Sequence, residues 1–503
     1  MTAPVPPTAP SLGRMAKNAS LYGLGSVLVA LIGVAMDPVL SHYLSRPQFG
    51  VLGLAASISG LLSALYAAGL DSAAGRFWYD VGDDPAKRKI TIGTFNTFLL
   101  VWLAALMLVQ ELAGPAIYSR FFNELPYSPW GRLIAVALLF NALSAVPRAI
   151  WTANEDVQIV VRLRVVASLL ANGVLFALLW GWQTGPLAVL VAQALVPALM
   201  LPVFLRFAWG RFGFAWDRTV LLQGLAFGLP MVIHLSSHWA LNAADRLVLE
   251  HLLGTDSVGL YSAAYNASTS ALITINLSLN GAYVPQFMRA QAEPNSQRFV
   301  GTAILALVGL ATLSALGFAL IGPAVFRLVY AEQYAAAADL FVPLCVGAAA
   351  QSVYLVAVNG LFFAKRTKLL PFLTLSAGII NIGLCYWWIP RFGLQGAAWA
   401  TAAAYVILAA LFVVAARTAT VLPWPTRRLL HLLLVVAAAA ALRLAIGPLA
   451  ATMDLLTGLG LTLAVPVVLW WTGFVAADDK VVLQAKLYSL LRRTRSLSEI
   501  NRF

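Results

Sequence analysis

Ionisable residues within the long apolar stretches of this sequence include Asp37, Asp245 and Arg246. A charge near the centre of a bilayer costs at least about 2.5–3.5 kcal/mol, so such residues are candidates for function. Asp37 precedes Pro38, which removes a backbone donor and kinks a helix. We expect its carboxylate either to line a cavity or to face water on the outer side. Two roles are predicted for Arg246. It either pairs with Glu250 one turn away or binds phosphate oxygens in a cavity.

Polar residues continue along one face of the same stretch, where His234, His238 and Asn242 follow one another at intervals of four. Two histidines at this spacing can bind a metal, but no third ligand accompanies them, so we predict no metal site. We expect the histidines to relay protons, to hydrogen-bond sugar hydroxyls, or only to bond neighbouring helices. No residue is predicted to be catalytic.

Two arginines, Arg148 and Arg76, stand where apolar stretches end on the side that the topology below places in the cytoplasm. Arginine side chains at such ends commonly extend to the lipid headgroups. The alternative is that both line the cytoplasmic mouth of a cavity, where they would be the first groups to attract an anionic substrate.

The elements that must position these residues are membrane-spanning helices. The 503 residues are 61% hydrophobic and 11% charged, against about 25% charged residues in a soluble domain. The apolar runs lack the alternation of barrel strands. We therefore predict an all-α polytopic membrane protein with fourteen transmembrane helices, at residues 19–40, 50–70, 90–110, 131–151, 165–181, 185–207, 220–248, 257–281, 299–322, 339–363, 371–389, 394–416, 429–447 and 455–475.

The distribution of cations predicts the orientation. With the amino terminus in the cytoplasm, most of the 33 basic residues fall in the loops and tails expected inside, as the positive-inside rule requires. The net charge of +13 is thus a topology signal, and no nucleic-acid partner is predicted. Both termini are expected in the cytoplasm of a bacterial inner-membrane protein, as a Pro-rich tail (1–18) and an amphipathic basic tail (477–503).

An enzyme is not predicted. The expected loops have no room for a catalytic domain, and the pair Gly-Lys of a phosphate-binding loop never occurs. No cofactor is expected, so transport would be driven by a proton or sodium gradient or by the substrate gradient itself.

An internal repeat is predicted from two pairs of segments. Asp37 precedes Gly50 by thirteen residues, and Asp245 precedes Gly259 by fourteen. Residues 185–193 and 393–401 form the second pair. Six spans separate the members of each pair, which predicts a duplicated body with an axis along the membrane normal. The expected organisation is an N-lobe (19–210), a C-lobe (211–418) and two further spans (419–476).

Four stretches resemble polysaccharide-exporter flippases, the O-antigen and capsule branch of the multidrug/oligosaccharidyl-lipid/polysaccharide exporter superfamily. They are residues 43–54 (YLSRPQFGVLGL), 69–77 (GLDSAAGRF), 325–334 (VFRLVYAEQY) and 392–400 (FGLQGAAWA). The position of Asp37 is similar to that of the first-helix aspartate of the multidrug branch, where that carboxylate binds the coupling ion.

The resemblance implies two six-helix lobes in a V, a central cavity and alternating access. It implies a flippase that carries an undecaprenyl-diphosphate-linked oligosaccharide from the cytoplasmic to the periplasmic leaflet, for lipopolysaccharide or exopolysaccharide. The implied partners are that polyprenyl-linked glycan, the lipid bilayer, and a polysaccharide polymerase with its chain-length machinery. Flipping of lipid II and export of cationic drugs are alternatives on the same scaffold.

Overall fold

The computed structural model describes residue 29 and residues 32–474, except residues 155, 183–184, 291–296, 421 and 448. Every regular element within these residues is a helix, so the prediction of an all-α protein is confirmed. The predicted tails 1–18 and 477–503 lie outside the described residues, as does most of the predicted span 19–40.

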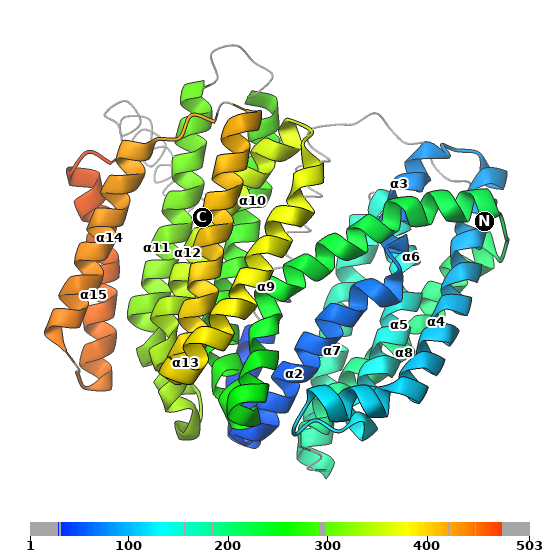
Figure 1. Ribbon diagram of the computed structural model, residues 1–503, viewed down its shortest axis with the longest axis horizontal. Helices are drawn as coiled ribbons and strands as arrows, with labels where there is room; N and C mark the ends of the chain where they lie inside the picture. The colour runs from blue at the N-terminus through cyan, green and yellow to red at the C-terminus, as the bar shows by residue number, and fades with distance from the viewer. Residues whose placement is uncertain are drawn as a thin grey trace, which may run out of the picture.

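The helices fall into two groups, with α2 and α9 running diagonally between them (Figure 1). The bounds of the elements up to the end of α9 are α2 (Arg46–Ala67), α3 (Leu70–Asp80), α4 (Pro85–Phe121), the π-helix η1 (Tyr127–Gly131), α5 (Arg132–Leu143), α6 (Ala145–Ala153), α7 (Val157–Trp182), α8 (Leu187–Phe212) and α9 (Arg218–Tyr265). The later elements are the π-helix η2 (Asn266–Ser270), α10 (Ala271–Ala290), α11 (Gln297–Val329), the 3-10 helices η3 (Glu332–Leu340) and η4 (Thr367–Leu369), α12 (Phe341–Phe363), α13 (Leu370–Ala419), α14 (Thr426–Ile446) and α15 (Ala451–Trp471).

Two of the longest helices are interrupted by a glycine. In α9 the backbone leaves the helical region at Gly254 (φ 79°), and in α13 at Gly393 (φ 56°). Both angles lie in the left-handed region that residues with a Cβ rarely adopt. Gly185, just before α8, shares this conformation (φ 58°). The break at Gly393 falls between the predicted spans 371–389 and 394–416.

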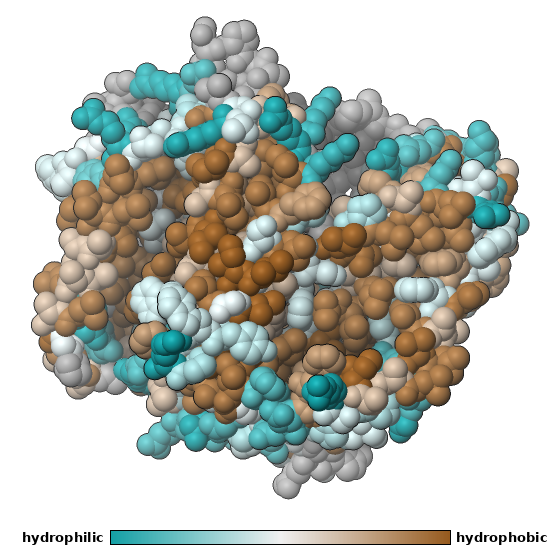
Figure 2. All heavy atoms as spheres, viewed as in Figure 1, coloured by the Kyte–Doolittle hydropathy of each residue, from teal (hydrophilic) through white to brown (hydrophobic). Residues whose placement is uncertain are grey.

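The surface supports the membrane assignment. Figure 2 shows hydrophobic residues across the middle of the molecule and hydrophilic residues at its upper and lower ends. Large apolar side chains point outward, including Leu112 at 75%, Trp180 at 82% and Trp471 at 80% exposure, an arrangement suited to lipid. Within the described residues eleven helices are long and apolar enough to span a membrane; the count of fourteen stays a prediction.

Cations gather at one end of the molecule. α4, α9, α11 and α14 all begin at the end that is uppermost in Figure 1. Their first turns carry Lys87, Arg218, Arg298 and Arg427. We call this the cation-rich end, and α2 begins with Arg46 at the opposite end.

The helix starts at the cation-rich end follow from local capping. Asp84 accepts hydrogen bonds from the backbone N–H groups of Ala86 and Lys87, and Asp217 does the same for Thr219 and Val220. Carboxylates at this position satisfy N–H groups that have no partner within the helix. The two N–H groups also hold the pKa of Asp84 below its usual range, the contact with Lys87 being the stronger.

The first described helical segment, 32–43, is fastened to the turn between α11 and α12. Ser41 Oγ accepts a hydrogen bond from Ala331 N at 3.0 Å. The carbonyl oxygen of Leu44 accepts from Gln333 Nε2 at 3.1 Å and from Tyr334 Oη at 3.0 Å. Residues near the start of the chain are therefore held by the second group of helices.

Candidate functional site

A basic pocket of about 270 Å³ opens among α3, α6 and α7. Arg148 from α6 and Arg164 from α7 line it together with Asp71 from α3. The Asp71 carboxylate attracts the Arg148 guanidinium, and the Arg164 guanidinium repels it. The Arg148 guanidinium also donates to the carbonyl oxygen of Asn141 at 3.2 Å. Two guanidinium groups against one carboxylate leave a positive site, suited to an anion.

The sequence predicted Arg148 at such a mouth but missed Arg164 and Asp71. Arg148 stands one turn into α6, where the short helix starts afresh after Ser144. Arg164 lies two turns into α7, two residues after Arg162. Their meeting depends on the packing of α6 against α7, which no sequence pattern specifies.

Arg76 lies elsewhere on α3 and contacts a different helix. Its guanidinium is 3.4 Å from the Asp80 carboxylate, in an exposed pair one turn away. It also stands over the ring of Phe227 on α9, 4.9 Å from the centroid, a cation–π geometry. The structure thus separates Arg76 from the pocket of Arg148 and places it at the contact of α3 with α9.

Asp245 is completely buried where α9 meets α13. Its carboxylate accepts hydrogen bonds from Tyr261 Oη at 2.5 Å and from Thr401 Oγ1 at 3.1 Å. A third bond comes from the backbone N–H of Arg246 at 2.8 Å. The carboxylate is therefore well satisfied within the protein, as a buried charge must be.

Arg246 is buried beside it and is also fully engaged. One Nη is 3.6 Å from the Asp245 carboxylate and donates to the carbonyl oxygen of Asn242 at 3.0 Å. Nε donates to Ser262 Oγ at 3.3 Å, and the guanidinium stands 4.3 Å from the ring centroid of Tyr265. The partner of Arg246 is thus Asp245 rather than Glu250.

Glu250 has a different task at the break in α9. Its buried carboxylate accepts hydrogen bonds from the backbone N–H groups of Asn123 at 2.6 Å and Glu124 at 3.1 Å. Glu124 in turn accepts from the backbone N–H of Thr255 at 3.2 Å and from its hydroxyl. The turn after α4 and the interrupted part of α9, beside Gly254, are therefore joined by two carboxylates, each of which accepts hydrogen bonds from the other segment.

The remaining predicted site residues divide between two places. The Asp37 carboxylate faces the side chain of Asn266 in η2. Asn242 Oδ1 accepts from the hydroxyl of Tyr405 on α13. The side chains of His234 and His238 lie outside the described residues, and only their places on α9 are described. Among the described residues no group of three or more His, Cys, Asp or Glu could hold a metal ion.

The chain matches a family model described as "Polysaccharide biosynthesis protein" over residues 15–291. It is 21% identical over 387 residues to the "Lsg locus putative protein 1" of Haemophilus influenzae, covering 73% of this chain and 90% of that protein. It is 24% identical over 408 residues to the "Lipid III flippase" of Escherichia coli, covering 78% of this chain and 95% of that protein.

Solved structures share the fold. The lipid II flippase MurJ in an inward closed conformation superposes with a TM-score of 0.73 at 12% identity, covering 90% of this chain and 99% of that one. A multidrug transporter of the MATE family in an inward-facing conformation superposes with a TM-score of 0.64 at 16% identity. The match covers 80% of this chain and 97% of that one. The resemblance predicted from the sequence is thereby confirmed: the chain belongs to the polysaccharide biosynthesis protein family and has the fold of the flippases and multidrug transporters of the MOP superfamily.

Proposed function

We propose that this protein is a flippase that carries an undecaprenyl-diphosphate-linked oligosaccharide from the cytoplasmic to the periplasmic leaflet of a bacterial inner membrane, to supply surface polysaccharide. The observation that carries the proposal is the family match over more than half of the chain. The likeness to a lipid III flippase over 78% of the chain supports it.

The basic pocket is the proposed first contact for the diphosphate. Arg148 and Arg164 present two guanidinium groups, and a guanidinium can bond two phosphate oxygens at once. The pocket belongs to the group of helices α3 to α8, and α6 and α7 meet at the cation-rich end. We place this end in the cytoplasm, together with both termini, because inner loops collect Lys and Arg.

Movement of the two helix groups about α2 and α9 would then expose the substrate alternately to either side. The polyprenyl tail stays in the lipid while the glycan crosses between the groups. Asp37 and Asp245 are the proposed sites of proton or sodium coupling, because each carboxylate faces a residue from another helical segment. Arg246 stabilises α9 through its contact with Asp245. A polysaccharide polymerase with its chain-length machinery would take up the delivered glycan.

The test replaces both arginines of the pocket in a strain whose surface polysaccharide depends on this protein. We expect R148Q/R164Q to lower surface polysaccharide about tenfold or more, since each lost charge-assisted bond is worth about 1.5–3 kcal/mol. Lipid-linked oligosaccharide should accumulate on the cytoplasmic side. The matched control is R162Q, an exposed arginine of the same helix that does not line the pocket.

Protein level, followed by immunoblot, must be the same in all three strains. Normal polysaccharide in R148Q/R164Q would contradict the proposed role of the pocket. Rescue of cells depleted of their lipid II flippase, or resistance to cationic dyes on overexpression, would instead assign the protein to one of the alternative substrates.

A further inference from the structure

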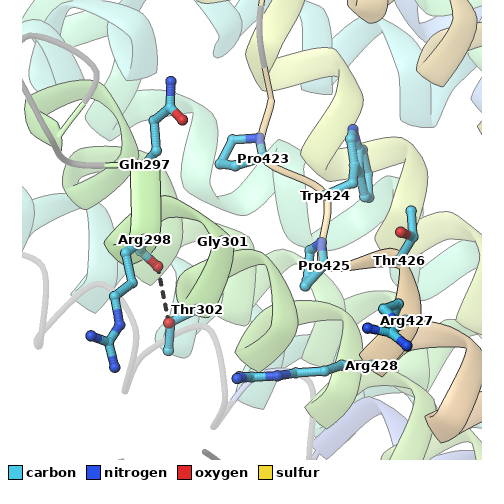
Figure 3. Close-up of a pocket in the computed structure, with 10 residues that line it drawn as sticks. All are labelled: Gln297, Arg298, Gly301, Thr302, Pro423, Trp424, Pro425, Thr426, Arg427 and Arg428. Carbon is cyan, nitrogen blue, oxygen red and sulfur yellow. Dashed lines mark hydrogen bonds between the residues drawn. The ribbon is translucent and has the colours of Figure 1, made fainter.

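A second basic pocket, of about 480 Å³, lies between the beginnings of α11 and α14. It is lined by Arg298 of α11 and by Arg427 and Arg428 of α14, and none of the described residues that line it is a carboxylate. Figure 3 shows Arg298 and Arg428 reaching from the two helices to the same side, with Thr302 between them. In the part of the chain that the structure describes, neither Arg427 nor Arg428 forms an ion pair. The pocket is therefore positive and ready for an anion.

The connection before α14 shapes this pocket. The carbonyl oxygen of Pro423 approaches α11 so closely that a Cβ on Gly301 would stand 3.1 Å from it. This contact sets Trp424 between the two helices, where its indole Nε1 is buried and has no acceptor among the described residues. An indole N–H buried without a partner is costly.

An apolar pocket of about 520 Å³ adjoins the basic one. Trp424 and Thr426 line both pockets. From there the apolar pocket continues between the helices α11 to α14, along side chains such as Val308, Val346 and Leu433. Its volume falls within the range of about 300–1,000 Å³ that is usual for ligand sites. A polar and an apolar compartment thus share one wall.

We propose that the two pockets together bind one anionic phospholipid of the membrane leaflet at the cation-rich end. The phosphate contacts Arg298, Arg427 and Arg428, and one acyl chain fills the apolar pocket. Basic pockets between transmembrane helices on the cytoplasmic side suit anionic headgroups, and the buried chain adds about 0.8 kcal/mol per methylene group. The amphipathic ligand matches both compartments, whereas free phosphate matches only one.

This site is distinct from the proposed substrate pocket. α11 and α14 belong to the group of helices at the left of Figure 1, and α6 and α7 to the opposite group. A lipid in this position would fasten α14, and with it α15, to α11. The proposal concerns a resident lipid and is independent of what the protein transports.

The test measures lipid binding to the purified full-length protein by native mass spectrometry and by thermal unfolding in detergent. Dioleoyl-phosphatidylglycerol should bind and raise the unfolding temperature. Dioleoyl-phosphatidylcholine and inorganic phosphate should each bind at least about tenfold more weakly. The choline cation of the first cancels the charge of its phosphate, and the second has no acyl chain. Equal binding of the two phospholipids would overturn the proposal.

Variants locate the site. R427Q/R428Q should weaken phosphatidylglycerol binding about tenfold or more, and R427K/R428K should restore part of it. The control R162Q/R366Q removes two exposed arginines from the same end of the molecule, outside both pockets. It should bind as the unchanged protein does. V346F, at a partly exposed position of the apolar pocket, should weaken binding of the long-chain lipid.

Loss of binding in the control, or unchanged binding in R427Q/R428Q, would overturn the assignment. So would displacement of phosphatidylglycerol by an equal concentration of undecaprenyl phosphate, since the occupant would then be the polyprenyl chain of a substrate.

Discussion

Gly50 and Gly259 meet in a reciprocal contact where α2 crosses α9. A Cβ on Gly50 would stand 2.0 Å from the carbonyl oxygen of Thr255, and a Cβ on Gly259 would stand 1.9 Å from that of Arg46. Arg46 lies four residues before Gly50 in the same helix, and Thr255 lies four residues before Gly259 in the other. Each glycine thus contacts a carbonyl oxygen that lies one turn before the glycine of the opposite helix. Two copies of a duplicated segment related by a two-fold axis produce this arrangement.

Alanine at either glycine is expected to destabilise the protein by about 3 kcal/mol, the upper end of the range for overpacking, because the obstructing atoms are backbone. Thermal unfolding of purified G50A and G259A in detergent checks this. G173A is the control, since a Cβ there has no neighbour within 4 Å and alanine favours a helix by about 0.5–1 kcal/mol. If G50A unfolds at the same temperature as the unchanged protein, α2 and α9 can move apart at no cost and the prediction is wrong.

Removal of one member of the buried pair Asp245–Arg246 should be costly. D245A leaves the Arg246 guanidinium buried without its counter-charge, and we expect a loss of about 3–5 kcal/mol in the free energy of unfolding. R327A is the control, because Arg327 and Asp339 pair at 2.8 Å, more closely than the 3.6 Å of Arg246 and Asp245, but are exposed. Exposed pairs contribute about 0–1 kcal/mol.

Arg246→Ala should likewise lower the amount of folded protein in the membrane, before any effect on substrate is seen. If this variant reaches the normal protein level but makes no surface polysaccharide, Arg246 instead acts in substrate binding.

The carboxylate contacts at the break in α9 give a third prediction. E250A leaves the backbone N–H groups of Asn123 and Glu124 without this acceptor, and a hydrogen bond to a charged group contributes about 1.5–3 kcal/mol. We expect faster proteolysis of the turn after α4, followed by limited digestion in detergent. E332A, at an exposed position, should be digested at the unchanged rate, and equal rates for both variants would deny Glu250 this role.

Asp37 permits a test of coupling. D37N keeps the shape and size of the side chain but removes the ionisable group. If Asp37 carries the coupling ion, flipping in reconstituted vesicles should lose its response to an imposed proton or sodium gradient, with the gradient-free rate retained. D256N is the control, because Asp256 pairs with Arg46 at a partly exposed position near the same end. A full gradient response in D37N would exclude the role.

Much of the fold could be predicted from the sequence, because hydropathy and glycine positions are local signals. The left-handed glycines Gly185 and Gly393 stand at the starts of the segments predicted as repeats. Gly50 and Gly259, predicted as corresponding residues, meet in space. The lobe boundaries and the count of fourteen spans stay predictions, in part because the first predicted span lies largely outside the described residues.

The site was harder to predict, because the sequence does not tell which side of a helix faces a neighbour. Spacing alone favoured Glu250 as a partner of Arg246 at i+4. The actual partner is the adjacent Asp245, held by Tyr261 and Thr401 from two other segments. These contacts join residues up to 156 positions apart, and such pairings depend on the assembled helices.

The attachment of residues 32–43 to the turn after α11 has a consequence for biosynthesis. Ser41 and Leu44 leave the ribosome some 290 residues before Ala331 and Tyr334, with which they bond. Translation proceeds at about 5–20 residues per second, so the first helix waits tens of seconds in the bilayer before residues 41 and 44 can form these bonds. Until then the nascent chain depends on the insertion machinery, and a ribosome stalled before residue 331 would leave this helix open to quality-control proteases.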